Sequence, residues 1–533
     1  MTPYSILPTS SPAASKGRAL FPGIWGLALA GVLAAGALFR LVTIGQDPIW
    51  LDEAYTLWFT EQSWEFLWRS MAGVETFPPL YYSLMKVWTQ VAGTSEVALR
   101  LPSALVGIAS ILLLAIAGRL ARSPALGVMA GGICALWQFQ IHYAMEARPY
   151  SFAALAVALM LAGAVQVLRN PDALRRPWRD FATGERPTLL GLVAIAFGMA
   201  LAPWMHVTGA IPTLIAGLYL LGWWAIRDRS GAAFAKLMAT AALALLLYLP
   251  NFRFVLGLGG RDMADFWLQA PKAWQLLQIT VQVYSQKVMA LPLKAEAVLM
   301  VLLVIGGAVG FWRATRSGAI LGLIVALMAG HWLAMVALTY LVQPVLLPRT
   351  LIFAQPPLLL LLAGLPWCLP RRMHAVAGLA FLGYLGAGFL LHTVRLNNYA
   401  DYRQMAAAIA ESPDADAPVL VMPGHFILPV TYYSGKADVR AFPRGAPDFT
   451  RVPATTTHDP TEAEMADLLA SLSGTPSFWV MLGNGMKNHA QVMAMIEAAG
   501  YDRHIAVGTA DYHPNLNYFT RLDKETLAFA PRP

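Results

Sequence analysis

Charged residues are scarce in this chain. Only 13% of its 533 residues are Asp, Glu, Lys or Arg, whereas 57% are hydrophobic. Soluble domains carry about 25% charged residues, so the composition excludes a wholly soluble protein and predicts a polytopic membrane protein with a soluble part. The net charge of +8 indicates no nucleic-acid partner, because most Lys and Arg residues fall in short segments between apolar runs.

Cysteine is also scarce. The two cysteines, Cys134 and Cys368, lie in or at the end of apolar segments, which excludes a disulfide framework and a cysteine metal cluster. The sequence lacks internal repeats, a phosphate-binding Walker motif and the GxGxxG fingerprint. These absences exclude a repeat architecture and the two commonest nucleotide-binding loops.

Long apolar runs, by contrast, are abundant. A membrane span needs about 20 mostly apolar residues. The first run continues past the small residues 35–37, which favours an uncleaved span over a signal peptide. The run 79–93 is short and contains Lys86, and we predict that it lies flat in the membrane interface. The eleven predicted spans are 22–44, 99–118, 124–143, 150–168, 188–205, 208–226, 234–250, 295–312, 318–341, 350–368 and 374–392.

The basic residues predict the orientation of these spans. With 79–93 lying flat, every basic cluster between spans falls on one side, which the positive-inside rule places in the cytoplasm. Treating 79–93 as a span would scatter those charges over both sides. We therefore predict that the long loops 46–98 and 251–293 lie on the outer face, together with everything after residue 392.

From about residue 393 the composition is that of a soluble domain. Strand-like and helix-like segments alternate there, which predicts a small α/β domain over 393–533. The predicted fold is therefore mainly α, a membrane helix bundle over 1–392 with this domain on the outer face. The predicted strands are 418–423, 477–482, 505–509 and 516–522, and the predicted helices are 401–411 and 489–499.

Several polar groups share the predicted outer face. Asp52 and Glu53 follow the first span, where carboxylates are candidates for function, although such a pair also caps helices. Glu146 and Arg148 precede a later span, where an interfacial ion pair is the alternative. Arg349 lies at the mouth of another span, where arginine commonly anchors the interface.

The order and spacing of these groups resemble the GT-C glycosyltransferases over essentially the whole chain. The similar branch is bacterial and is related to dolichyl-phosphate-mannose protein mannosyltransferases and to the lipid A aminoarabinose and galacturonic acid transferases. One position departs from the family pattern, because Phe77 stands where the family has a His before Pro-Pro. The matching segments are 52–53, 77–82, 100–105, 146–150, 205–207, 348–350 and 401–403.

The resemblance implies that a sugar moves from a polyprenyl-phosphate donor to an acceptor hydroxyl with inversion. Asp52 is then predicted to be the general base, with Glu53 beside it as the second catalytic candidate, supporting Asp52 or holding the acceptor. The phosphate leaving group needs cations rather than a general acid, and arginine grips phosphate well. The predicted phosphate ligands are Arg349, Arg148 and Lys287, and the predicted substrate contacts are Glu146, His206 and Tyr82.

No cofactor is predicted with certainty, but the residues are compatible with a divalent metal ion. Glu75 and His206 are its weak candidate ligands, and two ligands are too few to define a site. The expected partners are the lipid-linked donor, membrane lipid, and a glycan, lipid or protein acceptor of the envelope, such as lipopolysaccharide. The expected location is the bacterial inner membrane, with the C-terminal domain in the periplasm.

Two other functions remain open at this point. A transporter or flippase of lipid-linked glycans would carry ionisable groups near mid-span and broken helices in paired halves. The acidic residues instead cluster at the outer mouth, which favours the enzyme. A non-catalytic scaffold that displays the α/β domain is the third reading. The sequence does not identify the sugar or the acceptor.

Overall fold

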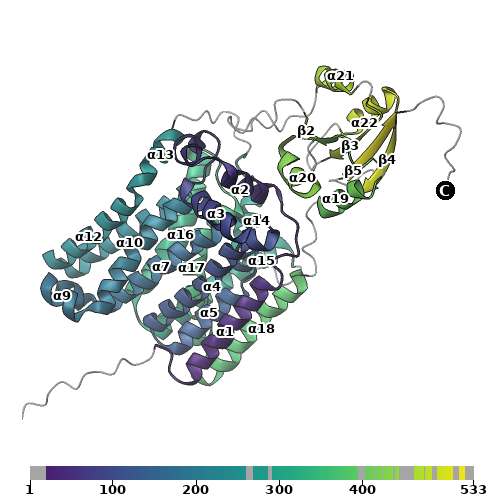
Figure 1. Cartoon of the computed structure of the whole chain (residues 1–533). Helices are drawn as coiled ribbons and strands as arrows, with labels where there is room; N and C mark the ends of the chain where they lie inside the picture. The colour runs from purple at the N-terminus through teal and green to yellow at the C-terminus, as the bar shows by residue number, and fades with distance from the viewer. Residues whose placement is uncertain are drawn as a thin grey trace, which may run out of the picture.

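The chain forms a bundle of long helices and a small α/β domain beside one end of it (Figure 1). The computed structural model describes residues 20–259, 268–285, 291–393, 402–412, 414–422, 424–435, 438–442, 461–472, 475–482, 489–507 and 515–521.

Nine helical segments in the described ranges are long and apolar enough to cross a membrane, so the chain is a multi-pass membrane protein. Five are the single helices α1 (Ile24–Leu41), α4 (Glu96–Ala121), α7 (Tyr150–Arg169), α10 (Arg186–Met205) and α15 (Leu293–Thr315). The others are Val207–Asp228 with α11 (Ala210–Trp223), Gly231–Leu258 with α12 (Gly231–Tyr248) and α13 (Phe252–Leu258), α16 (Gly318–Leu341), and Arg371–Leu390 with most of α18 (His374–Thr393).

Two predicted spans are not single long helices. The predicted span 124–143 is α5 (Pro124–Leu136) and α6 (Gln138–Ala144), which meet at a 60° bend where Trp137 has extended backbone angles. Over 350–368 the chain forms η6 (Pro348–Ala354), α17 (Gln355–Leu362) and η7 (Leu365–Cys368). Prolines at the starts of these pieces remove backbone donors and begin new turns. The predicted eleven spans thus become nine, or ten if the bent pair counts as one.

Short helices lie at both ends of the bundle (Figure 1). α2 (Leu51–Glu61) and α3 (Pro79–Ala92) lie at the end that faces the α/β domain, whereas α9 (Trp178–Gly184) lies at the other end. α3 has 14 residues, or about 21 Å at 1.5 Å per residue, too short for a hydrocarbon layer of about 30 Å. The remaining short elements are η1 (Phe66–Ser70), η2 (Met71–Gly73), α8 (Pro171–Arg175), η3 (Val207–Gly209), η4 (Trp224–Asp228), η5 (Leu249–Asn251), α14 (Ala273–Tyr284) and η8 (Arg371–Met373).

The small domain is built on a five-stranded sheet of order β2-β1-β3-β5-β4. β2, β1 and β3 run parallel, whereas β5 is antiparallel to both of its neighbours. β1 and β3 are buried at every residue, as expected of central strands that are covered on both faces. The strands are β1 (Val419–Met422), β2 (Val439–Ala441), β3 (Ser477–Leu482), β4 (Tyr501–Val507) and β5 (Asn515–Arg521).

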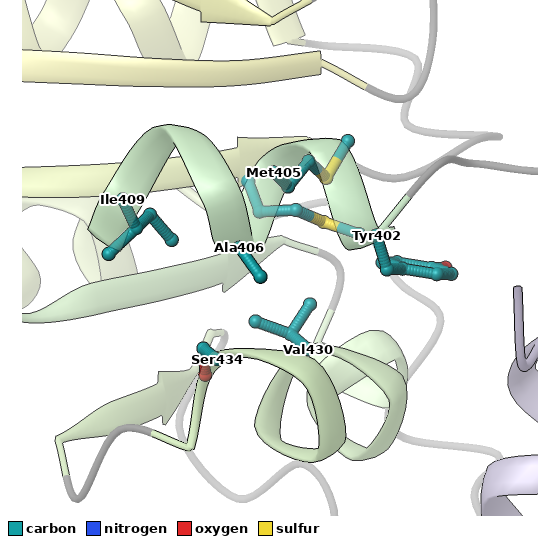
Figure 2. Close-up of a pocket in the computed structure, with 7 residues that line it drawn as sticks. Tyr402, Met405, Ala406, Ile409, Val430 and Ser434 are labelled. Atoms are coloured by element: carbon teal, nitrogen blue, oxygen red, sulfur yellow. The ribbon is translucent and has the colours of Figure 1, made fainter. Parts of the chain in front are cut away.

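Helices cover both faces of this sheet. α21 (Glu462–Ser471) and α22 (His489–Ala498) share one apolar core with Phe478, and α19 (Tyr402–Ala410) and α20 (Ile427–Ser434) share the other with Trp479. Figure 2 shows a small apolar gap between α19 and α20. Its volume of about 10 Å³ is at most that of one water molecule, so it is a packing gap and not a ligand site.

Candidate active site

The ion pair between Asp52 and Arg349 is the centre of the candidate site. Asp52 is the second residue of α2, and Arg349 lies in η6, 297 residues later. Arg349 Nη1 is 3.0 Å from Asp52 Oδ2, and the two side chains are 25% and 20% exposed. The structure therefore brings together the predicted base and a predicted phosphate ligand, in a place that solvent can reach. Trp50 is the N-cap residue of α2, and its backbone N–H donates to Glu53 Oε2 at 3.4 Å, so the capping role belongs to Glu53 and not to Asp52.

Glu53 is held in a different way from Asp52. It accepts hydrogen bonds from Arg100 Nε (2.7 Å) and Nη2 (2.6 Å) and from the backbone N–H of Ala147 (2.8 Å). Glu53 and Arg100 are 1% and 3% exposed. This bidentate pair fixes α2 against α4 and the segment 145–149, and the geometry suits a residue that supports Asp52. Sequence reasoning did not find the pairing, although an arginine buried in an apolar helix needs hydrogen-bond partners, of which a carboxylate is one.

Arg148 lies beside Asp52 but is deeply buried. Its Nη1 donates to the backbone oxygen of Asp52 (3.2 Å) and to Tyr82 Oη (3.1 Å), and Tyr82 donates to Glu75 Oε2 (2.8 Å). The guanidinium also lies 4.3 Å from the ring centre of Phe77. Arg148 is only 4% exposed, so it supplies a fixed positive charge next to the ion pair.

His206 and Phe77 form an aromatic contact beside this cluster, since the Phe77 ring also contacts Arg148. Their ring centres are 4.8 Å apart at an angle of 85°, and His206 Nδ1 accepts from the backbone N–H of Thr208 at 3.1 Å. Burial, together with the charges of Arg349 and Arg148, lowers the pKa of His206 from 6.5 to about 3. The imidazole is therefore neutral at ordinary pH, and it cannot add a third positive charge to the site.

The residues around Phe77 do not fit a metal ion. The described part of the chain holds no group of three or more His, Cys, Asp or Glu residues arranged to bind one. The Glu75 carboxylate already accepts from the N–H groups of Thr76 (2.6 Å) and Phe77 (3.3 Å) and from Tyr82. Both oxygens of Glu75 and Nδ1 of His206 thus have partners within the protein, and a metal at these two residues stays a prediction.

The remaining predicted residues lie away from the ion pair or outside the described ranges. Glu146 pairs with His142 (3.0 Å), and its Oε2 is buried without a partner in the described part of the chain. Together with Asp47, Glu53 and Arg100 it lines a small pocket. Lys287 lies outside the described residues, so its predicted role stays a prediction, as do the substrate roles of Glu146, His206 and Tyr82.

Tyr82→Phe tests how far the site depends on the partly buried chain of hydrogen bonds from Arg148 through Tyr82 to Glu75. Losing the hydroxyl leaves Glu75 Oε2 and one contact of Arg148 without a partner. An unsatisfied buried polar group costs about 1–3 kcal/mol, and we expect the midpoint of thermal unfolding in detergent to fall accordingly. Tyr340→Phe, which removes an exposed hydroxyl, is the matched control. An equal midpoint for Tyr82→Phe and wild type would contradict the assigned bonds.

Comparison with known proteins places this site on a known fold. No protein-family model matches the sequence, and no curated protein is significantly similar to it. The structure is similar to ArnT from Cupriavidus metallidurans in the apo state, with a TM-score of 0.59 at 14% identity over 93% of this chain and 98% of that one. For ArnT bound to undecaprenyl phosphate the TM-score is 0.57 at 15% identity, with the same coverage.

An archaeal protein shows the same architecture. The oligosaccharyltransferase AglB from Archaeoglobus fulgidus, in complex with an inhibitory peptide and a dolichol-phosphate, matches with a TM-score of 0.51 at 12% identity over 92% of this chain and 74% of that one. These proteins are GT-C glycosyltransferases. The GT-C fold that the sequence motifs predict is therefore confirmed over nearly the whole chain.

Proposed function

We propose that this chain is a membrane glycosyltransferase that moves a sugar from a polyprenyl-phosphate donor to an acceptor hydroxyl. The observation that carries the proposal is the accessible ion pair of Asp52, in α2, and Arg349, in η6, with α2 at one end of the bundle (Figure 1). It supplies a carboxylate and a guanidinium, which are the two groups that the reaction needs. The fold supports the same reaction, because the similar ArnT binds undecaprenyl phosphate.

Donor binding in this proposal begins with an exchange of partners. A phosphate monoanion or diester matches the guanidinium fork as well as a carboxylate does, so the donor phosphate competes with Asp52 for Arg349. Arg148 adds positive charge nearby, where it is held by the backbone oxygen of Asp52. When Arg349 turns to the phosphate, the Asp52 carboxylate is released and can accept a proton.

The transfer step then uses the released carboxylate. The acceptor oxygen attacks the anomeric carbon while Asp52 takes the hydroxyl proton. The bond between that carbon and the phosphate oxygen breaks, and its electron pair stays on the phosphate. Arg349 stabilises the charge that develops there. The products are the inverted glycoside and polyprenyl phosphate, and Asp52 returns its proton to water.

The proposed site lies on the periplasmic side of the bacterial inner membrane. The site lies at the end of the bundle near α2, and α9, which follows the basic residues Arg175 and Arg176, lies near the opposite end (Figure 1). The positive-inside rule then places α9 in the cytoplasm and the site outside. The acceptor in this proposal is a glycan, lipid or protein of the envelope.

The proposed function is tested with purified protein in lipid and a panel of polyprenyl-phosphate sugars. Release of free polyprenyl phosphate supports the proposal. Lack of release with every donor, in protein whose unfolding is cooperative, would contradict it. Flipping of lipid-linked glycans is the second candidate, favoured by the 60° break between α5 and α6, and a flipping assay with the same lipids decides it.

Arg349→Lys tests the phosphate role. Lysine keeps the charge but replaces a two-pronged donor by a point charge. We expect turnover to fall on the order of 10²-fold, as for the loss of one donor to a developing oxyanion, with a higher KM for the donor. The matched control is Arg69→Lys, in the exposed pair with Glu65, which should retain wild-type turnover. Wild-type kinetics in Arg349→Lys would remove Arg349 from the site.

A further inference from the structure

The loop that leads into the site is held through its backbone from two sides. Residues 42–50 connect α1 to α2 and end two residues before Asp52. From the membrane bundle, Arg100 donates to the backbone oxygens of Ile44 (2.9 Å), Asp47 (2.7 Å) and Pro48 (2.9 Å). The same guanidinium also holds Glu53, so it fixes the loop and the start of α2 together.

The outer domain holds the same loop from the opposite side. Arg403, in α19, donates to the backbone oxygens of Gly45 (3.0 Å), Gln46 (2.9 Å) and Asp47 (2.9 Å). Five consecutive carbonyls, from residue 44 to residue 48, are therefore taken by two guanidinium groups. A guanidinium offers five N–H donors in a rigid fork, which suits it to fix a turn of backbone.

A second contact joins the outer domain to this loop. The N–H of Ile49 donates to Tyr433 Oη at 2.6 Å, and Tyr433 in turn donates to Glu96 at the start of α4. Glu96 also receives Arg403 Nε at 2.8 Å. Tyr433 stacks on Tyr402 with an angle of 8° between the rings. The domain is thus bonded to both the loop and the bundle at the point where α2 begins.

We propose that Arg403 and Tyr433 are positioning residues, through which the outer domain fixes the loop 44–50 and hence the place of Asp52 beside Arg349. This inference rests on the proposed function for its kinetic consequence. A displacement of about 1 Å at reacting groups can cost on the order of 10²-fold in rate. The domain therefore acts on the chemical step itself, in addition to any contact that it makes with an acceptor.

The test compares Tyr433→Phe and Arg403→Ala with a control in the same domain. Tyr433→Phe keeps the ring stack on Tyr402 and removes only the hydroxyl, so the domain stays folded. Arg440→Ala, which breaks an exposed pair with Asp438, is the control. We expect faster hydrogen–deuterium exchange in peptides covering residues 44–53 of both test variants, starting with the amide of Ile49, and wild-type exchange in the control.

The kinetic readout separates positioning from simple attachment of the domain. We expect kcat to fall at least 10-fold in Arg403→Ala while the KM for the donor changes less than 3-fold, because the donor phosphate is bound by Arg349. Arg403→Lys should restore only part of the loss, since an ammonium has three donors, whereas Arg403 bonds three backbone oxygens and both carboxylate oxygens of Glu96.

The experiment distinguishes a failure of the positioning role from a failure of the proposed function. Unchanged exchange over 44–53 in both test variants, or unchanged kcat despite faster exchange, would overturn the positioning role. Absence of turnover in the wild type would count against the proposed function, and the exchange of residues 44–53 would then decide alone whether Arg403 and Tyr433 hold the loop.

Discussion

Asp52→Asn is expected to lower the release of polyprenyl phosphate by roughly 10²–10⁴-fold, the usual contribution of a positioned general base. Asparagine keeps the size of the side chain but cannot take the acceptor proton. It also frees Arg349 from its ion pair, so the KM for the donor should stay equal or fall. A loss of kcat with a lower donor KM is a combination that general damage to the site does not produce.

The matched control for this variant is Asp172→Asn, in an exposed pair with Arg175 at the other end of the bundle, and it should retain wild-type kinetics. Equal turnover in Asp52→Asn and wild type would keep the glycosyltransferase and move the base to another carboxylate. Glu53 and Glu146 are the next candidates.

Glu53→Ala is expected to destabilise the protein by about 3–5 kcal/mol, because it leaves the buried Arg100 guanidinium without its carboxylate. Glu65→Ala, which breaks the exposed pair with Arg69, should cost no more than about 1 kcal/mol. The measurement is the shift of the unfolding midpoint in the same detergent. Similar shifts for the two variants would mean that the pair of Glu53 and Arg100 does not hold α2.

A double variant separates stability from activity at this pair. Replacing both partners, as in Glu53→Met with Arg100→Met, removes the unpaired charge but should recover only part of the lost stability, because the backbone groups that the pair bonded lose their partners. Activity should not return, because Arg100 also holds the backbone oxygens of Ile44, Asp47 and Pro48. Recovery of full turnover would show that these backbone bonds are dispensable.

The sequence predicted most of the bundle because long apolar runs and basic loops report directly on membrane crossing. The sequence predicted the breaks within the helices less accurately. Pro356 and Pro357 lie within the predicted span 350–368, where hydropathy alone does not register the break, and the bend at Trp137 has no proline beside it. In the small domain, the segments 418–423, 477–482 and 516–522 match β1, β3 and β5.

Short and non-local features escaped prediction for physical reasons. β2 has three residues and α20 has eight, too few to show a clear period. β4 begins at Tyr501, four residues before the predicted strand 505–509, because the chain turns at Gly500 without an apolar signal. In the site, residue type and position predict Asp52 as the base and Arg349 as a phosphate ligand, each on its own. The partner of Glu53 was missed, since Arg100 lies 47 residues away.

The grip on the loop 44–50 has a consequence for how this chain tolerates change. Every residue has a backbone carbonyl oxygen, so hydrogen bonds to the main chain do not depend on most of the side chains along it. The exposed Gln46 can be replaced without disturbing a bond of either arginine, whereas Gly45 has Val97 only 3.0 Å from where a β-carbon would stand. A single inserted or deleted residue is different, because it would shift the five carbonyl oxygens relative to the guanidinium groups of Arg100 and Arg403. This segment must therefore preserve its length, far more than the identity of its residues.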